Sequence, residues 1–487
     1  MSRRKDLRRQ QQRKRFLGRT NQEDLASSQD WFLPNDGIFA RLKFHGNTSW
    51  SPRELVWLAL RWAWSECHHL TDAFNEVVQG CQKVSEPSPL KSYQGFMKAM
   101  VTWTSIFISL LWPVLQTRMH DIGGRFWRIN GWIPIAFDGA RNSASRTKGN
   151  EAALCAPRYG KGHTARHRKK KTKGMRRQQN QRNKPRPPKP QAWITLLWHM
   201  GLRLPWSWRL GPSNSSERAH VMELIGTGKF PQNTLFCGDA GFVGYPLWSK
   251  ILRHQAHFLV RVGANVDLLR SGTLCEFQAN GSVLCWPAAA IKANLPPLRL
   301  RLVRAKIGKT RVWLLTSVLD PLQLSPQEMV RFYKMRWGIE VEFRGLKQTL
   351  EGAKLRSHNP ERLLAELNWS IMAMAVAELF ALKEQLSKRR RSPTKEPPAD
   401  PVKRSLAKTI KAIRGCLRNL NDVPFPGQDL PTLLRNASTD SYQRKASKKA
   451  RYRPPNPDKK PLGDPKIRKL RTDERIKLNN LTGELAL

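Results

Sequence analysis

The sequence predicts an α/β protein that carries an additional helical region at its N-terminus. From Gly131 onward, short apolar runs of strand length alternate with helical stretches, which is typical of a sheet covered by helices. The strand-like runs are 132–137, 193–198, 234–237, 257–262, 298–305 and 310–318, and the helical stretches among them include 216–225 and 246–254. Before Gly131 the apolar spacing is helical from Ser51 to about Gln116.

Helix-start signals support the helical region and two later helices. Ser51-Pro52-Arg53-Glu54 has an N-cap serine, proline at the first helical position and glutamate at the third. Ser325-Pro326-Gln327-Glu328 repeats this pattern and predicts a helix through about Leu350, and Asn359-Pro360-Glu361 predicts another through Leu382.

The stretch 100–116 is the part of the chain that most resembles a membrane span. It contains Thr, Ser, Gln and Pro113, and it is shorter than the roughly 20 apolar residues that a span needs. We therefore expect a buried helix. The basic N-terminus also lacks the apolar stretch of a secretory signal.

The runs 298–305 and 310–318 are joined by Lys306-Ile307-Gly308-Lys309, a connection typical of a β-hairpin. Together with 274–286 they predict a β-rich insertion at about 264–324.

The charge of the chain points to a polyanionic partner. Its 86 Lys and Arg against 37 Asp and Glu give a formal net charge of +49, far more than solubility requires. Residues 1–20, the segment 158–191 and the tail after Lys388 are basic, and we expect them to be disordered without a partner, apart from one short helix from Pro401 to Leu420. They either contact phosphates in a salt-dependent way or have no specific role. Seven scattered cysteines indicate reduced thiols in a cytosol-like compartment.

Two aspartates follow predicted buried strands. Asp138 ends 132–137 and precedes Gly139, and Asp239 follows 234–237 within Gly238-Asp239-Ala240-Gly241. Either aspartate alone is explained by a turn in which the side chain bonds the backbone. Both also stand where a strand meets a loop, which is where site residues of α/β proteins gather.

The helix predicted after Ser325 carries a polar stripe. Tyr333, Arg336, Glu340 and Lys347 are spaced by three, four and seven residues, which at about 100° per residue places them within an arc of roughly 60°. A solvated charged stripe is the alternative. The apolar Trp337, Phe343 and Leu346 on the same helix favour packing into a core instead.

Asp138, Asp239 and Glu340 are together a set of hard oxygen donors. Two Mg²⁺ ions bound by three carboxylates can clamp the attacking and leaving oxygens of a phosphoryl transfer. Arg336 and Lys347, near Glu340 in the sequence, are suited to holding phosphates.

The spaced set Tyr333, Arg336, Glu340 and Lys347, within YKMRWGIEVEFRGLK, resembles the Y-R-E-K signature of DDE transposases of the insertion sequence 4 family. Asp138 in IAFDGA and Asp239 in CGDAGF resemble the contexts of that family's two catalytic aspartates. The resemblance covers about 129–384. It implies an RNase H-like catalytic domain with its β-rich insertion between Asp239 and Glu340.

The resemblance implies a transposase that cuts DNA at element ends and joins them to target DNA. Asp138, Asp239 and Glu340 would be catalytic and would bind two Mg²⁺ ions, for which Mn²⁺ can substitute. Tyr333, Arg336 and Lys347 would contact DNA. The implied partners are double-stranded DNA and a second subunit, as a homodimer on DNA, and the implied location is the bacterial cytoplasm, at the nucleoid rather than a membrane.

The predicted organisation places a basic arm at 1–20, a helical DNA-binding domain at 21–128, the catalytic domain at 129–384 and a basic, proline-rich tail at 385–487. The long basic segment 158–191 and the tail depart from the family pattern. A noncatalytic DNA-binding protein derived from a transposase is therefore the main alternative. An RNA-binding protein is a third, supported by charge alone.

Overall fold

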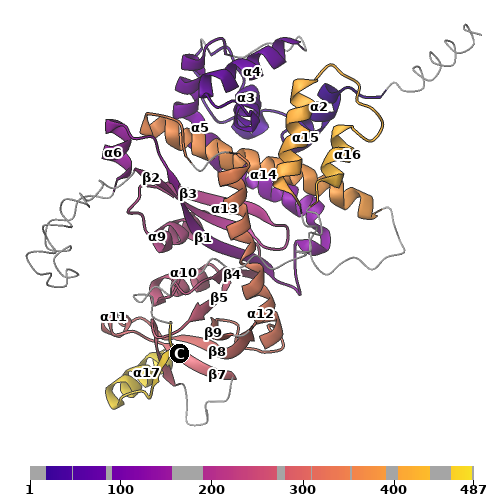
Figure 1. Ribbon diagram of the computed structural model, residues 1–487. Helices are drawn as coiled ribbons and strands as arrows, with labels where there is room; N and C mark the ends of the chain where they lie inside the picture. The colour runs from indigo at the N-terminus through magenta and orange to yellow at the C-terminus, as the bar shows by residue number, and fades with distance from the viewer. Residues whose placement is uncertain are drawn as a thin grey trace, which may run out of the picture.

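The computed structural model describes residues 18–46, 48–83, 90–155, 190–270, 280–308, 310–350, 354–390, 404–438 and 462–484. A ten-stranded mixed sheet runs through the molecule, and most of the long helices gather at one end of it (Figure 1). The predicted arm 1–20 and basic segment 158–191 lie almost entirely outside the described residues.

The α-helices are α2 (Asn21–Phe32), α3 (Pro52–Trp64), α4 (Leu70–Lys83), α5 (Tyr93–Gly123), α6 (Lys148–Leu154), α9 (Glu217–Thr227), α10 (Tyr245–Arg253), α11 (Ala288–Lys292), α12 (Pro326–Met335), α13 (Gly338–Gln348), α14 (Pro360–Arg390), α15 (Leu406–Arg418), α16 (Leu430–Asn436) and α17 (Thr472–Glu484). The strands are β1 (Ile133–Ser143), β2 (Gln191–His199), β3 (Leu204–Gly211), β4 (Thr234–Gly238), β5 (His257–Val262), β6 (Asp267–Arg270), β7 (Asn280–Cys285), β8 (Leu298–Ile307), β9 (Thr310–Thr316) and β10 (Lys466–Arg468).

One half of the sheet has the order β3-β2-β1-β4-β5. Strands β1, β2 and β3 are antiparallel neighbours, whereas β4 is parallel to both β1 and β5. This is the strand arrangement of an RNase H-like core, so the predicted fold class is confirmed. Strand β3 was not predicted from the sequence, because Pro205 and two nearby arginines obscure its apolar pattern. The strand lies at the edge of the sheet, where a proline is tolerated.

The other half of the sheet is formed by the predicted β-rich insertion. Strands β9, β8, β7 and β6 extend outward from β5, and every pair in this run is antiparallel. The predicted hairpin is β8–β9, and its turn contains Gly308 at φ 61°. The insertion therefore continues the catalytic sheet and is not a separate sheet.

The N-terminal helices share a core with α14. The indole Nε1 of Trp64 donates to the carbonyl oxygen of Ala373 at 2.9 Å, and that of Trp369 donates to Oγ1 of Thr104 at 2.8 Å. Helix α14 passes among α3, α5, α15 and α16 in Figure 1. Residues of the two domains predicted at 21–128 and 129–384 thus pack together in this core.

Helices α5 and α14 are long and apolar enough to cross a membrane by composition. The most apolar window of α14 is 89% buried within the protein, and that of α5 is 39% buried. The stretch 100–116 lies in α5, which contacts α14 along its length and contains Pro113. The expectation of a buried helix therefore holds for one face of α5, and Ile106 lies on its exposed side.

Parts of the tail after Lys388 are ordered by packing. The short helix expected at 401–420 is confirmed as α15, whereas α16, β10 and α17 are ordered contrary to the expectation of disorder. Helix α15 buries Ile410, Ile413 and Cys416, and it packs against α2 and α14. Farther along, β10 pairs with β6 in parallel. The composition of the tail is misleading because its few apolar residues lie on one helix face and are covered by distant helices. Residues 391–403 and 439–461 lie outside the described residues.

Candidate active site

Asp138 and Asp239 lie side by side at the same edge of the two central parallel strands. Ala136 of β1 is in register with Cys237 of β4, and each aspartate follows two residues later. Both strands are fully buried up to this point, and both aspartates are partly exposed. The parallel pairing therefore brings together two carboxylates that are 101 positions apart in the sequence.

Each aspartate accepts a backbone hydrogen bond on one oxygen. The Gly139 N–H donates to Oδ1 of Asp138 at 2.8 Å, and the Gly241 N–H donates to Oδ1 of Asp239 at 2.7 Å. The turn interpretation is supported for Asp239 only. It is wrong for Asp138, which lies within β1, because pairing with β2 extends that strand to Ser143. The second oxygen of Asp138 has a different neighbour, since Oδ2 lies 3.7 Å from Nη1 of Arg336.

The helix predicted from Ser325 to Leu350 is in fact two helices. Helix α12 ends at Met335, Arg336 and Trp337 form a turn, and α13 begins at Gly338. Gly338 packs so closely on Trp198 that a Cβ atom there would lie 2.2 Å from the indole ring. The break therefore lets α13 approach β2, and the predicted single 60° arc does not describe these residues.

Arg336 is the buried centre of this turn. It is 4% exposed, and its guanidinium carbon lies 5.4 Å from the ring centre of Tyr333 and 5.8 Å from that of Trp337. Its Nε is buried without a hydrogen-bond partner among the described residues. Tyr333 is also buried, at 5% exposed, whereas Trp337 is 56% exposed, which contradicts the expectation that this tryptophan packs into the core.

Glu340 lies in the first turn of α13, with its side chain exposed. Burial raises the pKa of Asp138, and the negative charges of Asp239 and Glu340 raise it further; the Gly139 N–H and Arg336 act in the opposite direction. The three predicted carboxylates are thus close enough to repel one another. Lys347, seven residues farther along α13, is partly buried, and burial lowers its pKa.

A fourth carboxylate, Glu217, reaches the same place from the start of α9. A Cβ atom on Gly139 would lie 2.4 Å from Oε1 of Glu217, so this carboxyl rests against the backbone next to Asp138. Burial raises the pKa of Glu217 to about 7, and the charges of Asp138 and Asp239 contribute to the increase. Sequence reasoning missed Glu217 because its position after Ser216 is explained by helix capping.

The four carboxylates are neighbours, but they do not form a preformed metal-binding site. Among the residues that the structure describes, no group of three His, Cys, Asp or Glu side chains is close enough to hold a metal ion. Mutual repulsion keeps such oxygens apart, and a divalent cation would relieve that repulsion. The donor set of Asp138, Asp239 and Glu340 therefore fits a hard cation in chemical type.

Comparisons with known proteins agree with this geometry. Residues 173–376 match the family model described as Transposase DDE domain, a range that contains Asp239, Arg336 and Glu340. The chain is also 31% identical, over 175 residues, to transposase InsG for insertion sequence element IS4 of Escherichia coli (strain K12). Residues 173–376 are thus similar to the DDE transposase domain family, and 175 residues are similar to a transposase of insertion sequence element IS4.

The similarity covers only part of each protein. The aligned region is 33% of this chain and 37% of InsG. A solved piggyBac transposase synaptic complex with hairpin DNA aligns over 87% of both chains at 12% identity, with a TM-score of 0.38. The RNase H-like fold follows from the strand order β3-β2-β1-β4-β5 and not from this distant alignment.

Asp138 precedes the matched range of the transposase domain, and the structure supplies the connection. Its strand β1 pairs with both β2 and β4, which lie inside that range.

Trp286 and Trp313, two aromatic side chains of the insertion, are engaged within the protein: Nε1 of Trp286 donates to the Leu295 carbonyl at 2.7 Å, and Nε1 of Trp313 donates to Asp464 at 2.6 Å. Both indoles are therefore held by contacts within the protein.

Proposed function

We propose that this chain is a transposase that cuts DNA at element ends and joins the freed 3′-OH to target DNA. The observation that carries the proposal is that Asp138 and Asp239 lie next to each other beyond the parallel-paired residues of β1 and β4, within reach of the charge of Glu340. The charges of Asp239 and Glu340 raise the pKa of Asp138, so the three carboxylates share one electrostatic environment. The transposase domain match supports the same reaction class.

Asp138, Asp239 and Glu340 are the residues that would hold two divalent ions, Mg²⁺ or Mn²⁺. Such ions, when bound, lower the pKa of water and stabilise the charge that develops on a phosphodiester. The protein itself fixes one oxygen of each aspartate through the Gly139 and Gly241 N–H groups. The other oxygens thereby keep a defined direction, which reduces the reorganisation that ion binding requires.

Arg336 has the role of holding the scissile phosphate beside the carboxylates. It is buried, it retains an unbonded Nε, and its guanidinium can bind a phosphate in a bidentate fork. Tyr333 lies beneath it and is only 5% exposed, so it positions Arg336 and makes little direct DNA contact. Lys347 extends the phosphate contacts along α13. The partner is double-stranded DNA in the cytoplasm, and paired cutting of two ends calls for a homodimer.

A cleavage assay tests this function. The full chain is incubated with Mg²⁺ and duplexes that carry the sequences flanking its gene, alongside Asp239→Asn, Glu340→Gln and the control Asp267→Asn, an exposed aspartate on β6. We expect flank-specific nicking and strand joining by the wild type and the control. Both site variants should lose cleavage, about 10³-fold or more, while still binding DNA.

The assay also distinguishes the main alternative. Tight DNA binding without cleavage by the wild type, on several flanking duplexes and with Mn²⁺ as well, would identify a noncatalytic DNA-binding protein. Cleavage that persists in Glu340→Gln would show that the carboxylates have been assigned wrongly.

A further inference from the structure

A groove of about 630 Å³ lies between the N-terminal helices and the catalytic core. It is lined by His68 and His69 from the loop before α4, by Tyr93 at the start of α5, by Ser145 just after β1, and by the stretch 354–362 between α13 and α14. Both histidines lie in the loop that borders this groove. The groove is therefore built from segments nearly 300 positions apart.

The groove is strongly cationic. Lys354, Arg356 and Arg362 line it together with three histidines, and its described lining contains no Asp or Glu. The side chains of Lys354 and Arg362 are exposed, and neither forms an ion pair in the part of the chain that the structure describes. Burial raises the pKa of Tyr93; the charge of Arg362 opposes this increase, the charge of Glu366 adds to it, and the charge of Arg356 opposes it. An anionic ligand would meet the exposed charges of Lys354 and Arg362 here, whereas Arg356 is paired with Glu366.

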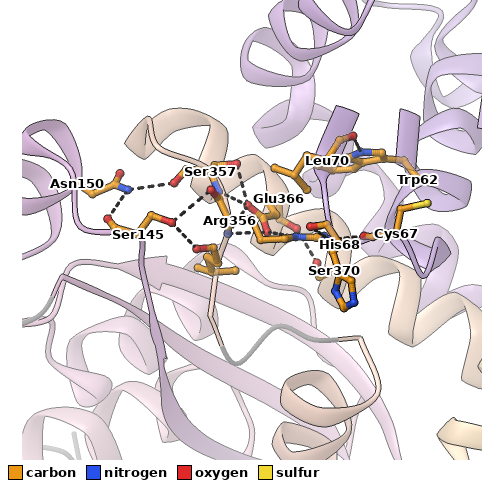
Figure 2. A network of polar contacts seen from close by, with 11 residues as sticks. Trp62, Cys67, His68, Leu70, Ser145, Asn150, Arg356, Ser357, Glu366 and Ser370 are labelled. Carbon is orange, nitrogen blue, oxygen red and sulfur yellow. Dashed lines mark hydrogen bonds and ion pairs between the residues drawn. The ribbon is translucent and has the colours of Figure 1, made fainter. Parts of the chain in front are cut away.

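One buried carboxylate fixes the wall of the groove, as Figure 2 shows. Glu366 is 3% exposed, and its oxygens accept bonds from the backbone N–H groups of Arg356 and Ser357 at 3.0–3.2 Å and from Oγ of Ser357 at 2.8 Å. Nε of Arg356 lies 3.3 Å from the same carboxylate. The carboxylate of Glu366 is thus engaged by hydrogen bonds and by its ion pair with Arg356.

The same wall forms hydrogen bonds with the loop before α4 on one side and with the residues that follow β1 on the other. Nη1 of Arg356 donates to the carbonyl oxygens of Cys67 and His68 at 2.9 and 3.3 Å. On the other side, Oγ of Ser145 donates to the Leu355 carbonyl at 3.0 Å, and Nδ2 of Asn150 donates to the Ser357 carbonyl at 3.1 Å (Figure 2). The groove is therefore preorganised, which lowers the entropic cost of binding.

The groove lies within a short distance of the carboxylates along the chain. Ser145 is seven residues after Asp138 on the segment that begins as β1, which corresponds to at most about 23 Å of extended chain. Duplex DNA rises about 3.4 Å per base pair. A duplex with its scissile phosphate at Asp138 can therefore reach the groove within one helical turn.

We propose that this groove, defined by Lys354, Arg356, Arg362, His68 and His69, binds the sugar-phosphate backbone of the DNA duplex within one turn of the cleavage site. This inference rests on the proposed function for its ligand. It adds a second point of attachment, formed jointly by the helical region and the catalytic core, so that the duplex is held on both sides of the junction. Phosphate contacts of this kind position the duplex and carry no base specificity.

The test compares the salt dependence of DNA binding by full-length proteins. The variant Lys354→Ala/Arg362→Ala removes two exposed cations of the groove, and the control Arg253→Ala/Lys292→Ala removes two exposed cations on α10 and α11. A short duplex without Mg²⁺ is titrated at several salt concentrations. Each lost phosphate contact reduces the slope of log Kd against log salt by about 0.9. We expect a reduction of about 1.8 for the groove variant and a smaller change for the control.

Equal slopes for the groove variant and the wild type would overturn the proposal, and so would tighter binding of a duplex RNA than of the DNA. Phosphate-ethylation interference supplies a second measurement: ethyl groups within about ten base pairs of the cut should block binding by the wild type and not by the groove variant. Binding is measured here without cleavage, so the two proposals can fail separately. If the groove binds DNA but the protein does not cut it, the proposed function is refuted and this inference stands.

Discussion

Nη1 of Arg336 lies 3.7 Å from Oδ2 of Asp138, and this ion pair joins the turn between α12 and α13 to the central strand β1. Both side chains are largely sheltered, with 5% and 20% of the side chain exposed. An ion pair in such a setting is screened less than a surface pair. Arg336 therefore influences both the charge of Asp138 and the place from which Glu340 approaches it.

Replacing Arg336 by Gln should shift the pH dependence of cleavage upward. Arg336 lowers the pKa of Asp138, so its loss raises that pKa, and a higher pH is then needed to ionise the carboxyl for metal binding. We expect at least a 10-fold loss of cleavage at pH 7 with partial recovery at higher pH. The measurement is a pH-rate profile, with Arg344→Gln, an exposed arginine on α13, as the control. An unchanged profile for Arg336→Gln would contradict the assignment.

Gly139→Ala should destabilise the protein through crowding at the site. The added Cβ would lie 2.4 Å from Oε1 of Glu217 and 2.7 Å from Nε1 of Trp193, and overpacking of this kind costs about 1–3 kcal/mol. Gly415→Ala is the matched control, because a Cβ there meets nothing within 4 Å and Gly415 lies inside helix α15. The control should be stabilising by up to about 1 kcal/mol. Urea unfolding measures both values, and equal stability of the two variants would refute the crowding argument.

Glu217→Gln should remove part of the pH dependence of stability. The pKa of Glu217 is raised from 4.5 to about 7 in the folded protein, so the folded state holds this proton more tightly than the unfolded state. Stability from this group is present below about pH 4.5 and is lost as the pH rises through 7. We expect the wild type to lose more stability than Glu217→Gln over this range in chemical denaturation. A parallel decline in both proteins would mean that Glu217 does not sense Asp138 and Asp239.

Trp337→Ala should weaken the binding of DNA without unfolding the protein. The side chain is 56% exposed beside Arg336, in the turn that precedes Glu340, and it is suited to stacking on a base. Stacking of this type contributes about 1–3 kcal/mol, or roughly 5- to 150-fold in affinity. Phe425→Ala, which removes an aromatic ring that is 77% exposed elsewhere, should leave affinity unchanged. Affinity and the unfolding midpoint are measured for each, and equal affinities would exclude a role for Trp337.

The sequence by itself determined the elements that have strong local signals. The hairpin of β8 and β9, the strand 257–262 and the capped starts of α3 and α12 follow from turn residues, apolar periodicity and N-caps, which act over a few neighbouring positions. The two aspartates and the Y-R-E-K spacing were also visible, because each stands in a short motif of neighbouring residues, although Asp138 lies within β1 and only Asp239 follows the end of its strand. The family resemblance only implied the relative positions of Asp138, Asp239 and Glu340.

The tertiary structure decided what depends on contacts between distant segments. Gly338 breaks the predicted long helix because it packs on Trp198, and Glu217 enters the site because Gly139 leaves space for its carboxyl. Likewise, the cationic groove exists because Glu366 holds residues 356 and 357 against the loop at Cys67 and His68. Such arrangements follow from burial and hydrogen bonding across hundreds of positions, and no local pattern of residues records them.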